Sequence, residues 1–103
     1  MAAKVIALYN APQDSQAFDK YYYGKHVPLA KSLPGLKGYE VSSGKVTDMS
    51  GASPYYLAAT LSFDSMQDIQ AALASAEGAA TAGDLGNFAT GGVSLLFFES
   101  KEI

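Results

Sequence analysis

Cysteine is absent from this chain of 103 residues. Without a thiol, the protein forms no disulfide, has no thiolate metal ligand and has no cysteine nucleophile. Disulfides are typical of oxidising compartments, so this composition fits a cytoplasmic protein, which is the localisation we expect. The first residues lack the apolar stretch of a secretory signal peptide. No apolar run approaches the roughly 20 residues of a membrane span, so we expect no membrane partner.

Arginine is absent as well, and seven lysines against ten acidic residues give a formal net charge of −3. Proteins that bind nucleic acid need a basic face and use arginine to contact phosphates and guanine, so we expect no nucleic-acid partner. Arginine also binds carboxylate and phosphate groups through two parallel hydrogen bonds. Its absence favours a neutral ligand, and we expect a small hydrophobic or aromatic molecule.

The sequence also lacks the motifs of common metal and cofactor sites. It holds one histidine, His26, and its carboxylates are scattered, so we expect no metal site. A GxGxxG motif does not follow the first predicted strand, and a GxSxG motif is missing, which disfavours a dinucleotide cofactor and a serine hydrolase. We therefore expect a protein without a cofactor. The length predicts one domain over residues 1–103.

Hydrophobic periodicity divides the chain into strands and helices. Helical spacing of apolar residues predicts one helix over about residues 16–33 and a second over about residues 65–76. Residues 78–82 are expected to be weakly structured, and residues 84–89 to form a loop or a single turn. Runs of β-branched and aromatic residues predict four strands, at residues 4–10, 38–46, 55–63 and 93–99.

The predicted order β-α-β-β-α-β is that of a ferredoxin-like α+β fold. Such a fold has a four-stranded antiparallel sheet with both helices on one face. The first and last predicted strands are apolar on both sides, so the uncovered face would be a large exposed apolar surface. We expect a homodimer in which two such faces pack together. The alternative is that an extra helix or residues 100–103 cover this face.

The segment around His26 has several features of a binding site. Three consecutive tyrosines precede the histidine by three to five residues, and Pro28 follows it. Pro28 donates no backbone N–H and disfavours helical geometry at Val27, so we expect the helix to bend or break here. His26 then either acts as a general acid or base, or hydrogen-bonds a carbonyl group that Pro28 leaves free.

Residues 18–29, FDKYYYGKHVPL, resemble the EthD family in their tyrosine pair, their histidine and their Val-Pro-Leu sequence. Segments 34–36, 39–41 and 84–88 extend the similarity over nearly the whole chain. The resemblance implies a dimeric α+β barrel built from two ferredoxin-like subunits. Barrels of this kind include muconolactone isomerases, polyketide cyclases and cofactor-free monooxygenases. The resemblance thus implies a small-molecule site and a cofactor-free oxidoreductase, isomerase or cyclase.

The resemblance also supports His26 as a catalytic residue that transfers a proton of the substrate. Tyr22 and Tyr23 precede it by four and three residues, so either can reach its side of a helix and bind a substrate oxygen. The alternative is that these tyrosines are core or surface aromatics. Tyr39 and Phe88 are further candidate substrate-binding residues, with simple packing as the alternative.

Asp84 completes the candidate substrate-binding residues and has three roles open to it. It can act as a second acid or base, raise the pKa of His26, or cap a turn. Tyr9 and Asn10, at the end of the first predicted strand, are also placed to line a cavity. Three functions remain open: a cofactor-free enzyme acting through His26, a non-catalytic ligand-binding protein, and a structural dimer with a filled barrel.

Overall fold

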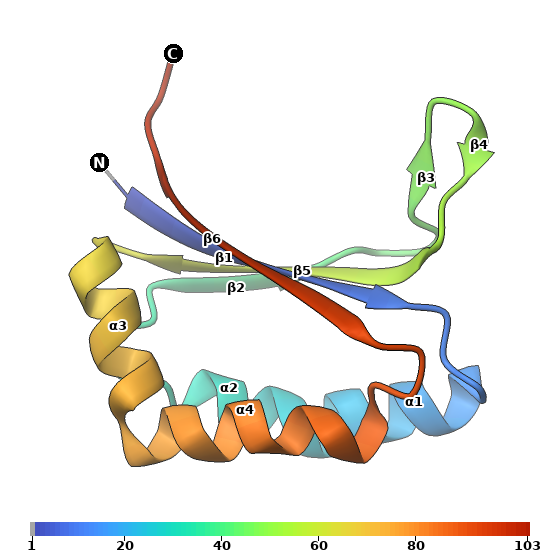
Figure 1. Cartoon of the computed structure of the whole chain (residues 1–103), viewed down its shortest axis with the longest axis horizontal. Helices are drawn as coiled ribbons and strands as arrows, with labels where there is room; N and C mark the ends of the chain where they lie inside the picture. Colours follow the sequence, from blue (N-terminus) through green and yellow to red (C-terminus); the bar gives the residue numbers. More distant parts are fainter. Residues whose placement is uncertain (1) are drawn as a thin grey trace.

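Four strands form one antiparallel sheet in the computed structural model, which describes residues 2–103 (Figure 1). The two central strands are β1 (Ala2–Asn10) and β5 (Tyr55–Phe63), and the edge strands are β2 (Gly38–Val41) and β6 (Val93–Ser100). The order across the sheet is β2-β5-β1-β6, with every neighbouring pair antiparallel. This order confirms the predicted ferredoxin-like α+β fold.

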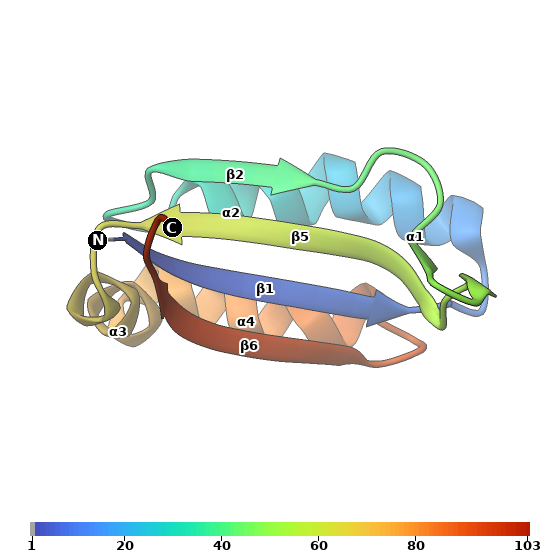
Figure 2. The same ribbon diagram turned by 90° about the horizontal axis from the view of Figure 1, so that it is seen from above.

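All the helices cover one face of the sheet (Figures 1 and 2). The first helical segment is continuous and consists of α1 (Ser15–Tyr21), the π-helical turn η1 (Tyr22–His26) and α2 (Val27–Lys31). The second consists of α3 (Met66–Ala74) and α4 (Ala76–Phe88), which meet at a corner. Within residues 2–103, no helix is long and apolar enough to cross a membrane.

The first helical segment continues through Pro28, which corrects the expected break. Val27 has helical torsion angles (φ −57°, ψ −46°), and its N–H donates to the carbonyl of Tyr22, five residues earlier. In a regular α-helix the proline ring would clash with the carbonyl of Gly24, which would also lose its donor. The wider π-helical turn relieves this conflict. Such single turns are rare and occur frequently at functional sites.

The π-helical turn also keeps one face of the segment directed at the sheet. Around a regular α-helix, residues spaced by four drift by about 40° per step, so three such steps turn them off the original face. The extra residue in the turn compensates for this drift. The buried residues of the segment therefore recur at intervals of four and then three: Phe18, Tyr22, His26, Ala30 and Leu33.

The core lies between the sheet and the helices and is centred on aromatic rings. Alternate residues of β1 and β5 point toward the helices and are buried. Where β1 meets the first helical segment and α4, four rings contact one another, with centroids 5.3–5.7 Å apart. Such pairs add to the stability that area burial alone provides. The four rings are those of Tyr9, Phe18, Tyr22 and Phe88.

The opposite face of the sheet carries no helix, and its β6 side is apolar (Figure 1). Ile6 of β1 pairs with Leu96 of β6, and Leu8 and Phe98 point to the same side because side chains alternate along each strand. We call these four residues the open-face patch. Leu96 and Phe98 are 48% and 43% exposed. The predicted apolar open face is therefore present.

The second strand is shorter than the expected strand over residues 38–46. It ends at Val41, and over Gly38–Val41 it pairs antiparallel with β5. Gly44 has a φ of 81°, which interrupts extended geometry. The following loop contains a small hairpin, β3 (Thr47–Asp48) and β4 (Gly51–Ala52), which rises on the open side of the sheet (Figure 1).

The segment after α3 is a regular helix, which corrects the weak structure expected for residues 78–82 and the loop expected for residues 84–89. Ser75 forms the corner: its hydroxyl oxygen accepts from the N–H of Gly78 (3.0 Å) and its hydroxyl donates to the carbonyl of Ala72. Alanine, the strongest helix former, fills many positions of α4. Both the cap and the alanines therefore favour a helix despite the glycines.

Two glycines of α4 give a matched test of this corner. A Cβ atom on Gly78 would lie against the backbone carbonyls of Ala72 and Leu73, whereas one on Gly83 would meet nothing within 4 Å. We expect Gly78→Ala to lower the free energy of unfolding by about 2–3 kcal/mol through this clash. Gly83→Ala should raise it by about 0.5–1 kcal/mol, because alanine favours a helix. Urea denaturation measures both, and equal effects of the two variants would contradict the close contact.

Candidate functional site

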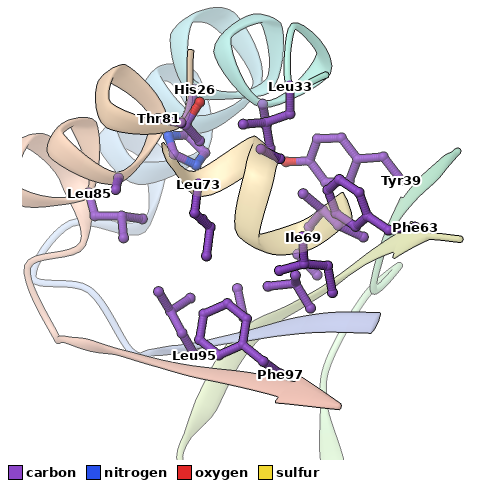
Figure 3. Close-up of a pocket in the computed structure, with 18 of the residues that line it drawn as sticks. His26, Leu33, Tyr39, Phe63, Ile69, Leu73, Thr81, Leu85, Leu95 and Phe97 are labelled. Atoms are coloured by element: carbon purple, nitrogen blue, oxygen red, sulfur yellow. The ribbon is translucent and has the colours of Figure 1, made fainter. Parts of the chain in front are cut away.

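A cavity of about 80 Å³ lies between the covered face of the sheet and the helices (Figure 3). Its wall is almost entirely apolar and comes from the helix-facing side of all four strands of the sheet, from η1 and α2, and from α3 and α4. A single enclosed water needs about 10–15 Å³, so the space holds several non-hydrogen atoms. The residues of the wall that carry polar groups are Tyr9, Tyr22, His26, Tyr39 and Thr81.

The cavity opens beside the edge strand β6. Leu95 and Phe97 of β6 belong to its wall and remain partly exposed, and so does Leu73 of α3. Figure 3 shows Leu95 and Phe97 on the sheet side of the space, with Leu73 and His26 on the helix side. The cavity is therefore least enclosed between β6 and α3.

His26 forms a buried pair with Asp84. Its Nδ1 atom lies 3.0 Å from Asp84 Oδ2, and the two residues are 4% and 7% exposed. The pair joins η1 to α4, two elements 58 residues apart in the sequence. The alternative expected from the sequence, a histidine bonded to a carbonyl freed by Pro28, is not what the structure contains.

Two further donors hold the carboxylate of Asp84. Its Oδ1 atom accepts a hydrogen bond from the hydroxyl of Tyr21 (2.6 Å) and one from the Nδ2 atom of Asn87 (2.9 Å). Burial acts to raise the pKa of Asp84, but the hydrogen bonds from Tyr21, Asn87 and His26 outweigh it and hold that pKa below its ordinary value. Asp84 is therefore an ionised carboxylate near neutral pH.

Burial dominates the titration of His26. Desolvation lowers the pKa of His26 below its ordinary value, and the opposing effect of the Asp84 carboxylate is smaller. Asp84 thus acts in the direction expected from the sequence, yet the net shift of the histidine is downward. Near neutral pH the imidazole is neutral, and because Asp84 only accepts, the proton sits on Nδ1.

The second imidazole nitrogen, Nε2, has no hydrogen-bond partner within residues 2–103. Within residues 2–103, every fully enclosed side-chain nitrogen or oxygen has a hydrogen-bond partner. The one hydrogen bond of the His26 ring in that part of the chain is the Nδ1 bond to Asp84. Nε2 is therefore not sealed in the packing, and it presents an unshared electron pair to the cavity that His26 lines.

Aromatic rings fix the plane of the imidazole. Tyr22 stacks on it at a centroid distance of 5.5 Å, and Phe88 lies against it at 4.7 Å. The hydroxyl groups of Tyr22 and Tyr39 are 2.6 Å apart and share a hydrogen bond, which ties η1 to β2. Burial raises the pKa of both tyrosines, so both stay protonated at neutral pH.

The structure brings most of the residues proposed from the sequence together. His26, Tyr22 and Tyr39 line the cavity. Asp84 and Phe88 lie behind the imidazole and contact it, and both belong to α4 instead of the expected loop. Their substrate contact stays a prediction, because their observed contacts are with the histidine.

Tyr23 lies elsewhere. It is 49% exposed and borders a second, wider hollow of about 520 Å³ beside α1. Neighbouring residues of a helix point about 100° apart, so the inward position of Tyr22 directs Tyr23 outward. Tyr9 lines the cavity as expected from its place in the chain, whereas Asn10 bonds the carbonyl of Gly91 instead.

The sequence does not point to two residues that contact the candidate site. Tyr21 and Asn87 hold the carboxylate of Asp84, yet neither was a candidate for the site. A helix over the expected loop would have placed Asn87 on the same face as Asp84, three residues earlier. Nothing in the sequence pairs Tyr21 with a residue 63 positions away.

Residues 2–103 contain no group of three histidine, cysteine, aspartate or glutamate side chains placed to hold a metal ion. The His26–Asp84 pair contributes only two such side chains, and the other neighbours of Asp84 are a phenol and an amide.

The single histidine makes its titration directly measurable. Because the pKa of His26 is lowered on folding, the unfolded chain takes up the proton first as the pH falls below about 6.5. The free energy of unfolding should therefore decrease as the pH is lowered from about 6.5 to 5, where Asp84 stays ionised. His26→Asn should remove this decrease. A midpoint of 6.5 or above for the one imidazole resonance in NMR would contradict the lowered pKa.

Comparison with known proteins identifies the family of this chain. The family model for the EthD domain matches residues 10–92. An uncharacterised 11.0 kDa protein from the thcB–thcC intergenic region of Rhodococcus erythropolis is 40% identical over 101 residues, covering 97% of this chain and 96% of that protein. The crystal structure of an EthD family protein from Bacillus halodurans C-125 is 34% identical, with a TM-score of 0.88, covering 98% of this chain and 100% of that one.

More distant structures share the fold alone. A hydroxynitrile lyase from Passiflora edulis has a TM-score of 0.78 at 15% identity, covering 99% of this chain and 95% of that one. Dimeric ferredoxin-like proteins of unknown function have the same fold at 15–17% identity. The family model and the two nearer relatives, by contrast, agree over almost the whole length, so this chain belongs to the EthD family.

Proposed function

We propose that this protein binds a small, neutral hydrophobic or aromatic molecule in the cavity and transfers a proton of that molecule through His26. The main support for this proposal is the buried hydrogen bond between His26 and Asp84. It occupies Nδ1 and leaves Nε2 of a neutral imidazole free to face the cavity that His26 lines. The imidazole itself accepts and returns the proton, so the step uses no cofactor. An isomerase, a cyclase and a cofactor-free oxidoreductase can each begin in this way. The lack of cysteine supports a cytoplasmic setting.

The surroundings of His26 suit a general base. Its lowered pKa keeps the imidazole neutral at pH 7, with the electron pair of Nε2 available. Once Nε2 takes a proton, the imidazolium lies 3.0 Å from the ionised carboxylate of Asp84. A fixed carboxylate behind a histidine stabilises the charge that develops and holds the ring in one tautomer. Asp84 is thus a positioning residue that acts through His26.

The cavity wall supports a neutral ligand. In residues 2–103, no lysine belongs to the wall, and the sequence contains no arginine. A carboxylate or phosphate would enter without a counter-charge, at a large cost in desolvation. An apolar body can pack against Leu61, Phe63 and Ile69 while one polar group faces the histidine.

A non-catalytic ligand-binding protein is the second candidate, because the same cavity would serve it. The carboxylate of Asp84 favours the enzyme, since binding alone does not require a histidine whose tautomer and charge are controlled. The hydroxynitrile lyase of the same fold also supports an enzymatic role. The open space beside His26 disfavours a structural dimer with a filled barrel.

We also propose that two copies pair through their open sheet faces. The open-face patch leaves Leu96 and Phe98 exposed in the single chain. The accessible surface is 6353 Å², whereas a folded monomer of this mass exposes about 5,500 Å². The excess, roughly 800 Å², is about what one partner buries in a stable interface. The dimeric ferredoxin-like proteins of the same fold support this arrangement.

A proton-transfer probe tests the proposed reaction without knowledge of the natural substrate. The probe, 5-nitrobenzisoxazole, is a neutral aromatic molecule: a base removes its ring C–H proton, those electrons form a nitrile, and the N–O bond breaks to release a coloured phenolate. We expect the protein to accelerate this elimination, and His26→Asn to reduce the rate at least about 100-fold with binding retained. The rate should fall as the pH drops below the pKa of His26.

Tyr56→Phe provides the control for this experiment. Its hydroxyl donates to Asp19 (2.8 Å) outside the cavity, so this variant should keep the wild-type rate. An unchanged rate in His26→Asn would show that another group is the base. Binding of the probe without turnover in the wild-type protein would instead favour the non-catalytic candidate.

The proposed dimer makes a separate prediction. Leu96→Lys places a charge in the open-face patch, where a second sheet would have to desolvate it. We expect this variant to be a monomer at micromolar concentration, while the wild-type chain is a dimer, by sedimentation velocity. Gln70→Lys, at an exposed position of α3 on the other side of the sheet, should remain dimeric. A monomeric wild-type chain would contradict the proposed interface.

A further inference from the structure

The hydroxyl group of Tyr9 is a polar group of the cavity that the proton transfer described above does not use. Tyr9 is 2% exposed, and it belongs to the cavity wall. In residues 2–103 its hydroxyl has no hydrogen-bond partner, yet every fully enclosed polar side-chain atom there has one. The hydroxyl is therefore open to a space, and the cavity is the space that Tyr9 borders.

Tyr9 and His26 approach the cavity from opposite layers of the fold. Tyr9 comes from β1 in the sheet, and His26 comes from the helical layer. Both rings contact the ring of Tyr22, at 5.6 and 5.5 Å, and both contact the ring of Phe88, at 5.5 and 4.7 Å. Because they share these two neighbours and both belong to the cavity wall, the two rings lie close to each other at the cavity.

The two groups have complementary hydrogen-bonding roles. Burial raises the pKa of Tyr9 above its ordinary value, and the nearby Tyr39 and Asp84 act in the same direction. Tyr9 therefore stays protonated and offers a donor. Nε2 of His26 offers an acceptor. A ligand that satisfies both in one apolar space must carry an acceptor oxygen close to a removable proton.

We propose that Tyr9 donates a hydrogen bond to the carbonyl oxygen of the ligand while His26 takes a proton from the adjacent carbon. The ligand class is then a small ketone or aldehyde with an apolar or aromatic substituent. This assignment rests on the proposed function of His26 and names its substrate class.

The step is balanced within the ligand and the two side chains. Nε2 takes the proton, the C–H electron pair becomes the carbon–carbon double bond of an enolate, and the carbonyl electron pair moves to the oxygen. The hydroxyl of Tyr9 donates to this oxygen as its negative charge grows. Return of the proton from His26 to a carbon or to the oxygen completes the transfer, so no oxidant or reductant is needed.

The geometry also makes Tyr9→Phe a clean variant. It removes one hydroxyl and keeps the ring, which packs against Phe18, Tyr22 and Phe88. Because the hydroxyl has no partner within residues 2–103, its loss breaks no internal hydrogen bond, and the variant should fold with at least the stability of the wild type.

Acetophenone and α-methylstyrene form a matched pair of probes, since they have nearly the same shape and only the ketone has an acceptor oxygen. We expect Tyr9→Phe to weaken acetophenone binding about fivefold and to leave α-methylstyrene binding unchanged, as measured by NMR titration. Tyr56→Phe, which loses a hydroxyl outside the cavity, should bind both probes as the wild type does. In Tyr9→Phe, exchange of the acetophenone methyl protons with deuterated water should also slow.

Other results of the binding experiments would contradict the proposed role of Tyr9 or of the cavity. Equal weakening of both probes would show that Tyr9 acts by packing, and no change in either would show that its hydroxyl does not face the ligand. In both cases binding itself would leave the proposed cavity function intact. Failure of both probes to bind the wild-type protein would overturn that function and this assignment with it.

Discussion

The hydrogen bond between His26 Nδ1 and Asp84 Oδ2, 3.0 Å long, links the two helical segments through the interior of the protein. A buried carboxylate is stable only when donors surround it, and here a histidine, a tyrosine and an asparagine supply them. Each donor requires a particular arrangement of the backbone. The π-helical turn points His26 inward, and the unbroken α4 places Asn87 beside Asp84. The shape of the helical layer and the chemistry of the site thus depend on the same pair.

The aromatic cluster makes this pair effective. Tyr22 and Phe88 pack against the imidazole, and the burial of His26 outweighs the effect of the carboxylate and lowers the pKa of His26. The ionised Asp84 favours uptake of a proton by the neutral His26. The lowered pKa of His26 favours its later release. The apolar wall around Nε2 strengthens this contrast, because charge that forms there is stabilised by fixed groups and not by solvent.

The sequence predicted the parts of this structure that depend on local periodicity. The strands and the βαββαβ order were predictable because the spacing of apolar residues, every second residue in a strand and every three to four in a helix, shows which face of each element is buried. The helix α4 was missed because its glycines concealed a cap at Ser75 that only a hydrogen-bond pattern reveals. The continuous helix at Pro28 was missed because a π-helical turn has no sequence signature. The pairing of His26 with Asp84 joins positions 58 residues apart, and no local pattern encodes such a contact.

The edge strand β6 connects the site to the outer surface of the sheet. Its side chains alternate, so Leu95 and Phe97 border the cavity mouth while Leu96 and Phe98 belong to the open-face patch. A strand with only one apolar face would serve either the cavity or an interface, but not both. Because β6 is paired with a neighbour on one side only, its position depends on what packs against its outer face. A second subunit seated there would hold the strand in place, and with it the two side chains that frame the entrance to His26.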